Sequence, residues 1–150
     1  MSSELVLAYD RTSDDPSILS TGASWADRLG ATLTVLHVVT DQQAERYRED
    51  GRSEGPYLDV ILDQLRDEIR AELIGAVGAE RADAIHVMTV KGDPEELVPA
   101  KAAELGAEAL LIGVRSRSRV AKLVFGSVAQ TIILLSPCPV LCLPSQHKAG

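Results

Sequence analysis

The residues best suited to binding an anion lie in the last third of the chain, on either side of a basic stretch. Gly113 follows one apolar run, and Gly126 and Ser127 precede another. Between them lie Ser116 and four basic residues, Arg115, Arg117, Arg119 and Lys122. A helix that begins at Gly126 and Ser127 would direct unpaired backbone N–H groups and the positive end of its dipole towards a ligand. This pattern is typical of phosphate binding. The alternatives are a plain turn, a helix cap and solvated loop charges.

An acidic residue, Asp10, directly follows the apolar segment Glu4–Tyr9. Such a segment is typical of a parallel strand that is buried on both faces. Open α/β sheets bind ligands at the carboxyl ends of their strands. Asp10 is therefore a candidate for binding the ribose hydroxyls of a nucleotide. The alternative is that its carboxylate accepts a hydrogen bond from the backbone of the next turn.

Residues typical of catalysis or metal binding are few, and their spacing matches no known catalytic or metal-binding set. Cys138 and Cys142 have no second Cys or His pair, so we expect buried free thiols rather than a disulfide or a zinc site. His37 lies inside a β-branched segment, where we expect a partly buried histidine with satisfied polar atoms. We therefore assign no catalytic and no metal-binding residues. At most, slow nucleotide hydrolysis near Asp10 is expected.

Apolar periodicity predicts five strands that alternate with four helices. The strands are expected at Glu4–Tyr9, Ala31–Val39, Ala84–Val90, Ala109–Ile112 and Val140–Leu143. The helices are expected at Pro16–Leu29, Tyr57–Ala76, Pro94–Leu105 and Val128–Leu135. The first and third helices begin at a proline that follows Asp15 or Asp93, and these aspartates are expected to cap them.

The alternation of strands and helices predicts a doubly wound parallel sheet with right-handed crossovers. Gly113 is expected to end the fourth strand and to open the basic loop. The polar segment Thr40–Gly55 has no periodicity and is expected to form a long loop, while Gly78–Asp83 is expected to be a connection. The length, 150 residues, suits a single domain over 1–150.

Charge and composition narrow the classes of partner. The chain has 15 basic and 22 acidic residues, which gives a formal net charge of −7 at pH 7. Non-specific binding of nucleic acid needs a broad basic face, which this composition does not favour. No apolar run reaches membrane-spanning length, and no basic and apolar leader precedes the first strand. We therefore expect a cytoplasmic protein that binds neither nucleic acid nor membrane.

The segment from Gly113 to Ser127 resembles the nucleotide-binding signature of the universal stress proteins, G-x-x-G, nine residues, then G-[S/T]. Gly113, Gly126 and Ser127 fit this spacing, while Ser116 stands where the second glycine is expected. The resemblance extends over nearly the whole chain. It implies a Rossmann-like α/β fold, with one five-stranded parallel sheet in the order 3-2-1-4-5 and helices on both faces. Asp10 and Gly113 would then meet between the first and fourth strands.

The resemblance also implies a ligand, an adenine nucleotide such as ATP with or without Mg²⁺. In this family an aspartate after the first strand belongs to the pocket. A residue at the position of Val38 or Val39 meets the adenine, and of the two we favour Val38. The glycines and serines of the signature lie along the phosphates, where Arg115 can add a charge-assisted hydrogen bond. The expected binding residues are Asp10, Val38, Gly113, Arg115, Ser116, Gly126 and Ser127.

The expected function is that of an ATP-binding regulatory protein of the stress response, which acts on an unidentified protein partner. The last strand is apolar and lacks the charges that usually protect a sheet edge, so it favours a two-fold homodimer, as in the family. The pairing residues would be Val140, Leu141, Cys142 and Leu143. Two alternatives remain open. One is a nucleotide-free dimeric interaction module in which Ser116 closes the pocket, and the other is a weak ATP hydrolase.

Overall fold

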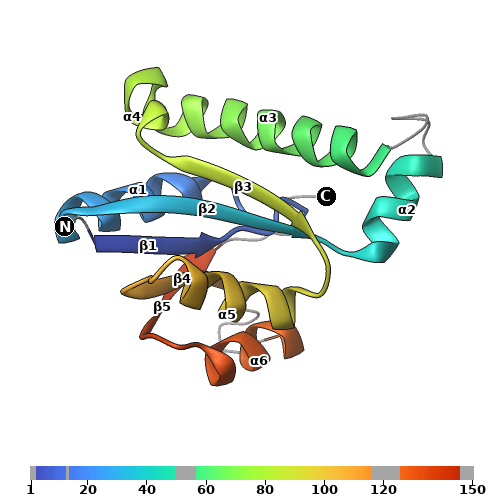
Figure 1. Cartoon of the computed structure of the whole chain (residues 1–150). Helices are drawn as coiled ribbons and strands as arrows, with labels where there is room; N and C mark the ends of the chain where they lie inside the picture. Colours follow the sequence, from blue (N-terminus) through green and yellow to red (C-terminus); the bar gives the residue numbers. More distant parts are fainter. Residues whose placement is uncertain (1–2, 13, 50–56, 116–125, 146–150) are drawn as a thin grey trace.

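The apolar, β-branched segments of the chain pair side by side in one sheet (Figure 1). The computed structural model describes residues 3–12, 14–49, 57–115 and 126–145. Its strands are β1 (Ser3–Ala8), β2 (Ala31–Val39), β3 (His86–Lys91), β4 (Ala109–Arg115) and β5 (Val140–Ser145). Neighbouring strands all pair in parallel, in the order β3-β2-β1-β4-β5. The predicted fold class and strand order are confirmed.

Helices cover both faces of the sheet, with α3 on one side and α5 and α6 on the other (Figure 1). The described helices are α1 (Ser17–Leu29), α2 (Asp41–Glu49), α3 (Tyr57–Val77), α4 (Ala79–Asp83), α5 (Pro94–Glu104) and α6 (Ser127–Leu135). Among the described residues, none of these helices combines the length and the apolar composition that crossing a membrane requires.

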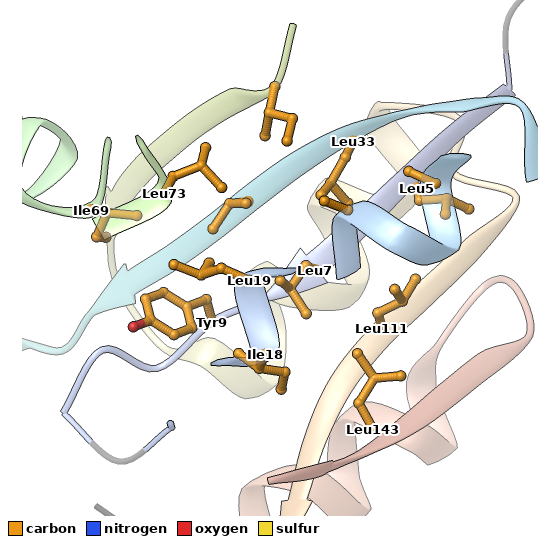
Figure 2. Packing of buried hydrophobic residues seen from close by; sticks show 14 of the residues in the cluster. Leu5, Leu7, Tyr9, Ile18, Leu19, Leu33, Ile69, Leu73, Leu111 and Leu143 are labelled. Carbon is orange, nitrogen blue, oxygen red and sulfur yellow. The ribbon is translucent and has the colours of Figure 1, made fainter. Parts of the chain in front are cut away.

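Two hydrophobic cores hold the helices against the sheet. Beneath α1 and α3, the core is formed mainly by leucines and isoleucines that are almost fully buried (Figure 2), including Leu5, Leu7, Ile18, Leu19, Ile69 and Leu73. Burial of each such side chain contributes about 1.5–3 kcal/mol to stability. On the opposite face, Val98 of α5 and Ile132 of α6 pack with Val6, Leu36 and Ile112. This second core continues into the floor of the cavity described below.

The segment after β2 is a helix, so the loop predicted for Thr40–Gly55 is wrong over most of its length. Thr40 and Gln43 cap α2 reciprocally. The Thr40 N–H donates to Gln43 Oε1 at 3.1 Å, and the Gln43 N–H donates to Thr40 Oγ1 at 3.2 Å. Ala44 packs on α3 in a small core of its own. A capping box and one apolar contact are enough to form a helix in this polar segment. Residues 50–56 of the predicted loop lie outside the described residues.

Gly113 lies inside β4, whereas the sequence predicts that it ends this strand. Gly113 pairs with Leu143, and the last residue of β4, Arg115, pairs with Ser145. The ladder between β4 and β5 therefore continues past the glycine, and both strands are longer than predicted. Residues 116–125, which contain most of the predicted basic loop, lie outside the described part of the chain.

Other element boundaries differ from the prediction by one or two residues. The first helix begins at Ser17 rather than Pro16, and the Asp15 carboxylate accepts a hydrogen bond from the Ser17 N–H at 3.0 Å. The third strand begins at His86 rather than Ala84. The segment Gly78–Asp83, predicted as a plain connection, contains the short helix α4.

Candidate functional site

A cavity of about 690 Å³ opens at the carboxyl ends of β1, β2 and β4, next to the starts of α5 and α6. The sheet order explains its position, because β1 lies between β2 and β4 and the chain reverses its direction of winding there. The cavity wall contains most of the residues predicted to bind the nucleotide, namely Asp10, Val38, Gly113, Gly126 and Ser127. Segments that are far apart in the sequence therefore meet at one site.

Two of the predicted binding residues are not placed at the cavity. Arg115 ends β4, but its side chain is not among the described parts of the structure. Ser116 lies outside the described residues, as do the other basic residues of the loop, Arg117, Arg119 and Lys122. Their roles at the phosphates stay predictions.

The floor of the cavity is apolar, and its rim is polar. Leu36 and Val38 of β2 line it together with Ile112 of β4, Val98 of α5 and Ile132 of α6. The rim carries the hydroxyl and amide groups of the α2 capping box and the acidic groups that follow β1. A largely apolar surface with a few fixed polar groups is the usual composition of a site for a small organic ligand.

Asp10 is exposed on the cavity wall, and its side chain also accepts hydrogen bonds from its own turn. Asp10 Oδ1 accepts hydrogen bonds from the Thr12 N–H at 3.0 Å and from Thr12 Oγ1 at 2.6 Å. This confirms the turn interaction that the sequence analysis gives as the alternative to binding. The two roles are compatible, because a carboxylate has about four acceptor positions.

Asp14 is a cavity residue that the sequence analysis missed. It is 7% exposed, and its Oδ2 accepts a hydrogen bond from the Asp10 N–H at 2.8 Å. A Cβ added to Gly113 would lie 2.8 Å from Asp14 Oδ1 and 2.7 Å from Ile18 Cδ1. Because Gly113 has no side chain, the buried carboxylate of Asp14 and the Ile18 side chain of α1 can pack against β4 at this position. The available signal is an acidic residue four positions after Asp10 and two positions before Pro16, the N-cap residue of α1.

The start of α6 is the most open helix terminus at the cavity. Gly126 precedes α6 with φ −60° and ψ 158°, and no side chain caps the helix there. A Cβ added to Gly126 would meet no heavy atom of the described residues within 4 Å. The start of α5 is different, because Asp93 accepts a hydrogen bond from the Glu95 N–H at 2.9 Å, as the sequence predicts. The first N–H groups of α6 can therefore receive an anion.

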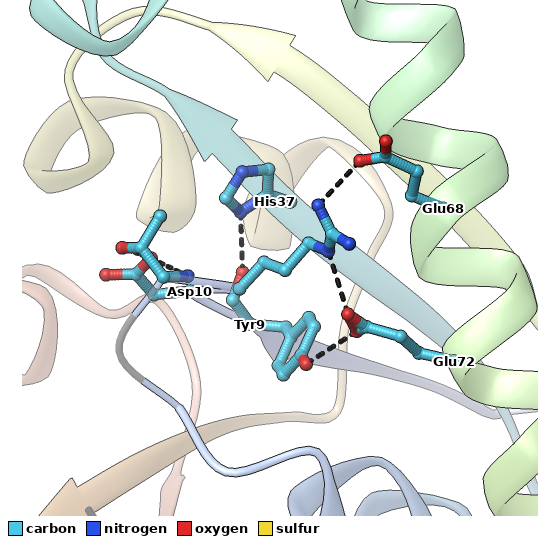
Figure 3. Close-up of polar contacts among 7 residues, drawn as sticks. Tyr9, Asp10, His37, Glu68 and Glu72 are labelled. Atoms are coloured by element: carbon cyan, nitrogen blue, oxygen red, sulfur yellow. Dashed lines mark hydrogen bonds and ion pairs between the residues drawn. The ribbon is translucent and has the colours of Figure 1, made fainter. Parts of the chain in front are cut away.

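His37 lies in the cavity wall and has a hydrogen-bonded ring, as the sequence predicts, but it is more deeply buried than expected. It is 2% exposed, and its Nδ1 lies 2.9 Å from the carbonyl oxygen of Tyr9 (Figure 3). A carbonyl only accepts, so Nδ1 must carry the proton. Burial lowers the pKa of His37, although the bond to Tyr9 opposes this effect. The imidazole is therefore neutral at pH 7.

The two cysteines lie away from the cavity, on and before β5. Both are free thiols, as predicted. Cys142 is exposed and Cys138 is half-buried, so the prediction that both are buried is wrong. Both residues belong to the edge of the sheet, since β5 has only β4 as a neighbour among the described strands.

A wider groove of about 820 Å³ lies at the opposite edge of the sheet, between β3 and α3. It is lined by charged residues of α3 and by β3, with Asp59, Asp63, Arg66, His86 and Thr89 among them. None of the predicted binding residues lines this groove. We therefore take the smaller cavity as the candidate site, since it combines an apolar floor with an open helix start.

Comparison with known proteins agrees with the fold. The model of the "Universal stress protein family" matches residues 1–144. A relative, the universal stress protein in the QAH/OAS sulfhydrylase 3′ region of Thermus aquaticus, is 29% identical over 140 residues, which cover 91% of this chain and 95% of the relative.

Solved structures of the same fold cover the whole length of the chain. A universal stress protein from Archaeoglobus fulgidus is 26% identical, with a TM-score of 0.55 and 99% coverage of both chains. A universal stress protein solved in complex with cAMP is 19% identical, with a TM-score of 0.57 and coverage of 97% of this chain and 99% of that one. Because the family model also matches almost every residue of the chain, this protein belongs to the universal stress protein family.

Proposed function

We propose that the cavity binds an adenine nucleotide, ATP together with Mg²⁺, and that the protein acts as a nucleotide-dependent regulator in the stress response. The observation that supports this most strongly is the convergence of Asp10, Val38, Gly126 and Ser127 on one cavity. The cavity volume of about 690 Å³ falls within the range of about 300–1,000 Å³ typical of small-molecule sites. A structural relative in the same family was solved with cAMP.

The charges around the cavity favour one orientation of the nucleotide. The first turn of α5 contains Glu95 and Glu96, and the first turn of α2 contains Asp41. The first turn of α6 contains no acidic residue. Because like charges repel, the phosphates are best placed at α6, where the helix dipole also attracts them. The base then contacts the apolar residues of the cavity, among them Val38 and Val98.

We also propose that two copies of the chain pair through β5. The Leu110 N–H donates to the Pro139 carbonyl at 2.9 Å, and alternate residues of a parallel strand bond to the same neighbour. The N–H groups of Val140 and Cys142 therefore point away from β4, towards the open edge. Leu134, at the end of α6 just before β5, is 82% exposed. A two-fold dimer would use the outward backbone groups and cover apolar surface.

Thermal unfolding with and without ATP and Mg²⁺ tests the nucleotide proposal. A ligand at about 100 times its Kd stabilises the folded state by about 2.7 kcal/mol, so the Tm should rise. Gly126→Asp provides the matched variant, because aspartate is a good cap for α6 and also occupies its N–H donors with a negative charge. The apo variant should be as stable as the wild type or more so, and should lose the Tm rise.

Gly126→Ser is the control, since serine caps α6 without a charge, and it should keep most of the Tm rise. No Tm rise in the wild type at millimolar ATP would contradict the proposal and favour the nucleotide-free interaction module. Phosphate release that Asp10→Asn abolishes would favour the weak hydrolase.

A further inference from the structure

Asp10 lies between Tyr9 and Arg11 in the sequence, and the side chains of both neighbours donate hydrogen bonds to Glu72 of α3 (Figure 3). Tyr9, on one side, donates its hydroxyl hydrogen to Glu72 Oε2 at 2.8 Å. Arg11, on the other side, donates from Nε to Glu72 Oε1 at 2.8 Å. Glu68, one helical turn earlier, accepts from Arg11 Nη1 at 2.6 Å. Glu72 therefore uses both of its oxygens to hold the two neighbours of Asp10.

The backbone around Asp10 is fixed from the other side of the turn as well. The Tyr9 carbonyl accepts the hydrogen bond from His37, and the Asp14 N–H donates to the Asp10 carbonyl at 2.7 Å. Together with the bond from the Asp10 N–H to Asp14, these contacts leave the main chain of Asp10 little freedom. These contacts fix the position from which the Asp10 side chain projects, and the hydrogen bonds from Thr12 to Oδ1 then hold its carboxylate.

The contacts of Glu72 persist over the physiological pH range, because both of its partners keep their protons. Burial, and then the hydrogen bond to Glu72, raise the pKa of Tyr9 above its usual value, so its hydroxyl stays protonated and keeps donating. Burial alone would lower the pKa of Arg11, but Glu72 and Glu68 outweigh it and raise this pKa, so the guanidinium stays charged. Neither Arg11 nor Glu72 is among the residues that line the cavity.

We propose that Glu72 is a positioning residue for the nucleotide site, which holds Asp10 in the direction that lets its carboxylate bind the ribose hydroxyls. This inference rests on the proposed nucleotide function. It depends on the negative charge of Glu72, because hydrogen bonds to a charged acceptor are stronger than hydrogen bonds to a neutral one. In a Glu72→Gln variant, the amide oxygen can accept from Arg11 only as a neutral partner. The Tyr9 hydroxyl keeps its contact only if it turns to accept from the amide N–H.

The test compares the affinities for ATP, 2′-deoxy-ATP and 3′-deoxy-ATP by calorimetric titration, well below the Tm. The wild type should bind ATP roughly tenfold or more tightly than the weaker deoxy analogue, as expected for a hydrogen bond to a charged acceptor. In Glu72→Gln this ratio should fall towards one. The affinity for inorganic tripolyphosphate should stay unchanged, because the phosphate end of the site does not involve Glu72.

Two further variants separate positioning from a general loss of stability. Glu80→Gln makes the same charge change on the exposed surface of α4 and should keep the wild-type ratio. Glu72→Asp retains two acceptor oxygens and should restore part of the ratio. Wild-type discrimination that survives in Glu72→Gln would overturn this inference and leave the nucleotide proposal standing. Absence of ATP binding in the wild type would overturn both.

Discussion

At Gly113 a side chain has no room, since an added Cβ would lie 2.7 Å from Ile18 Cδ1 and 2.8 Å from Asp14 Oδ1. Gly113→Ala should therefore lower the free energy of unfolding by about 1–3 kcal/mol, the usual cost of overpacking. Gly126→Ser, at a position open among the described residues, should change it by about 0.5 kcal/mol or less, because serine is also a good N-cap residue. Urea unfolding of both variants measures the difference. Equal losses at the two sites would contradict this explanation of Gly113.

The buried imidazole of His37 should make stability depend on pH. Its pKa in the folded state is lowered by burial, so the unfolded chain, with a value of about 6.5, binds the proton more readily. The contribution of neutral His37 is therefore complete above about pH 6.5 and is lost as the pH falls through the folded-state pKa. The free energy of unfolding should fall in this window by at most about 1.4 kcal/mol per pH unit from this one group.

His37→Asn isolates this effect, because the asparagine amide can donate to the Tyr9 carbonyl in place of Nδ1 and does not titrate. The pH slope of wild-type stability below about pH 6.5 should become shallower in this variant. His86→Asn, the same change at an exposed position of β3, serves as the control. A slope that His37→Asn leaves intact would show that other groups cause the acid sensitivity.

Several site residues could be predicted because the sequence itself carries their chemistry. Asp10 follows an apolar strand, and Gly126 and Ser127 have a family spacing before an apolar helix. Asp14 could not be recognised in the same way. Its importance comes from the missing side chain of Gly113, which lies on a distant strand, and sequence periodicity does not encode contacts between a turn and a distant strand.

At the scale of the element, the open edge of β5 predicts how two copies meet. Cys142 is exposed there, and its N–H points outward from the ladder with β4. Cys142→Lys places a charge on the pairing edge and should convert a dimer into a monomer without loss of helical or strand content. Sedimentation equilibrium and circular dichroism measure the two properties.

A surface lysine elsewhere controls for net charge. Ile74→Lys on α3, where Ile74 is 42% exposed, should leave the dimer intact. Two results would contradict pairing through β5. One is a wild-type protein that stays monomeric at high concentration, and the other is a Cys142→Lys variant that remains dimeric.

The elements with a strong apolar stripe are those that the sequence predicts well. α3 differs from its predicted range by one residue. The sequence predicts a loop where α2 lies, because only Ala44 of the α2 side chains is buried. Its signal was the capping pair at Thr40 and Gln43, three residues apart, which is independent of hydrophobicity. The extension of β4 past Gly113 depends on pairing with β5, so local sequence does not specify it.

At the scale of the whole molecule, the alternation of strands and helices explains why the cavity exists. Right-handed crossovers place every strand end and the following helix start at one edge of the sheet. The alternation predicts a parallel sheet, and the family resemblance implies its strand order and therefore the meeting of Asp10 with Gly113 at this cavity. The volume of the cavity and the groove at the other edge of the sheet depend on how side chains pack there. The topology alone does not determine this packing.

The most direct test of the account is an NMR titration of the ¹⁵N-labelled protein with ATP and Mg²⁺, in which every assigned amide reports on its own surroundings. We expect saturable chemical-shift changes at the amides of four residues that line the cavity, Asp10, Val38, Gly126 and Ser127. The amide resonances of Asp63 and Thr89, in the groove beside β3, should not shift. Shifts confined to that groove, or none at millimolar ATP, would contradict the central claim that this cavity is a nucleotide site.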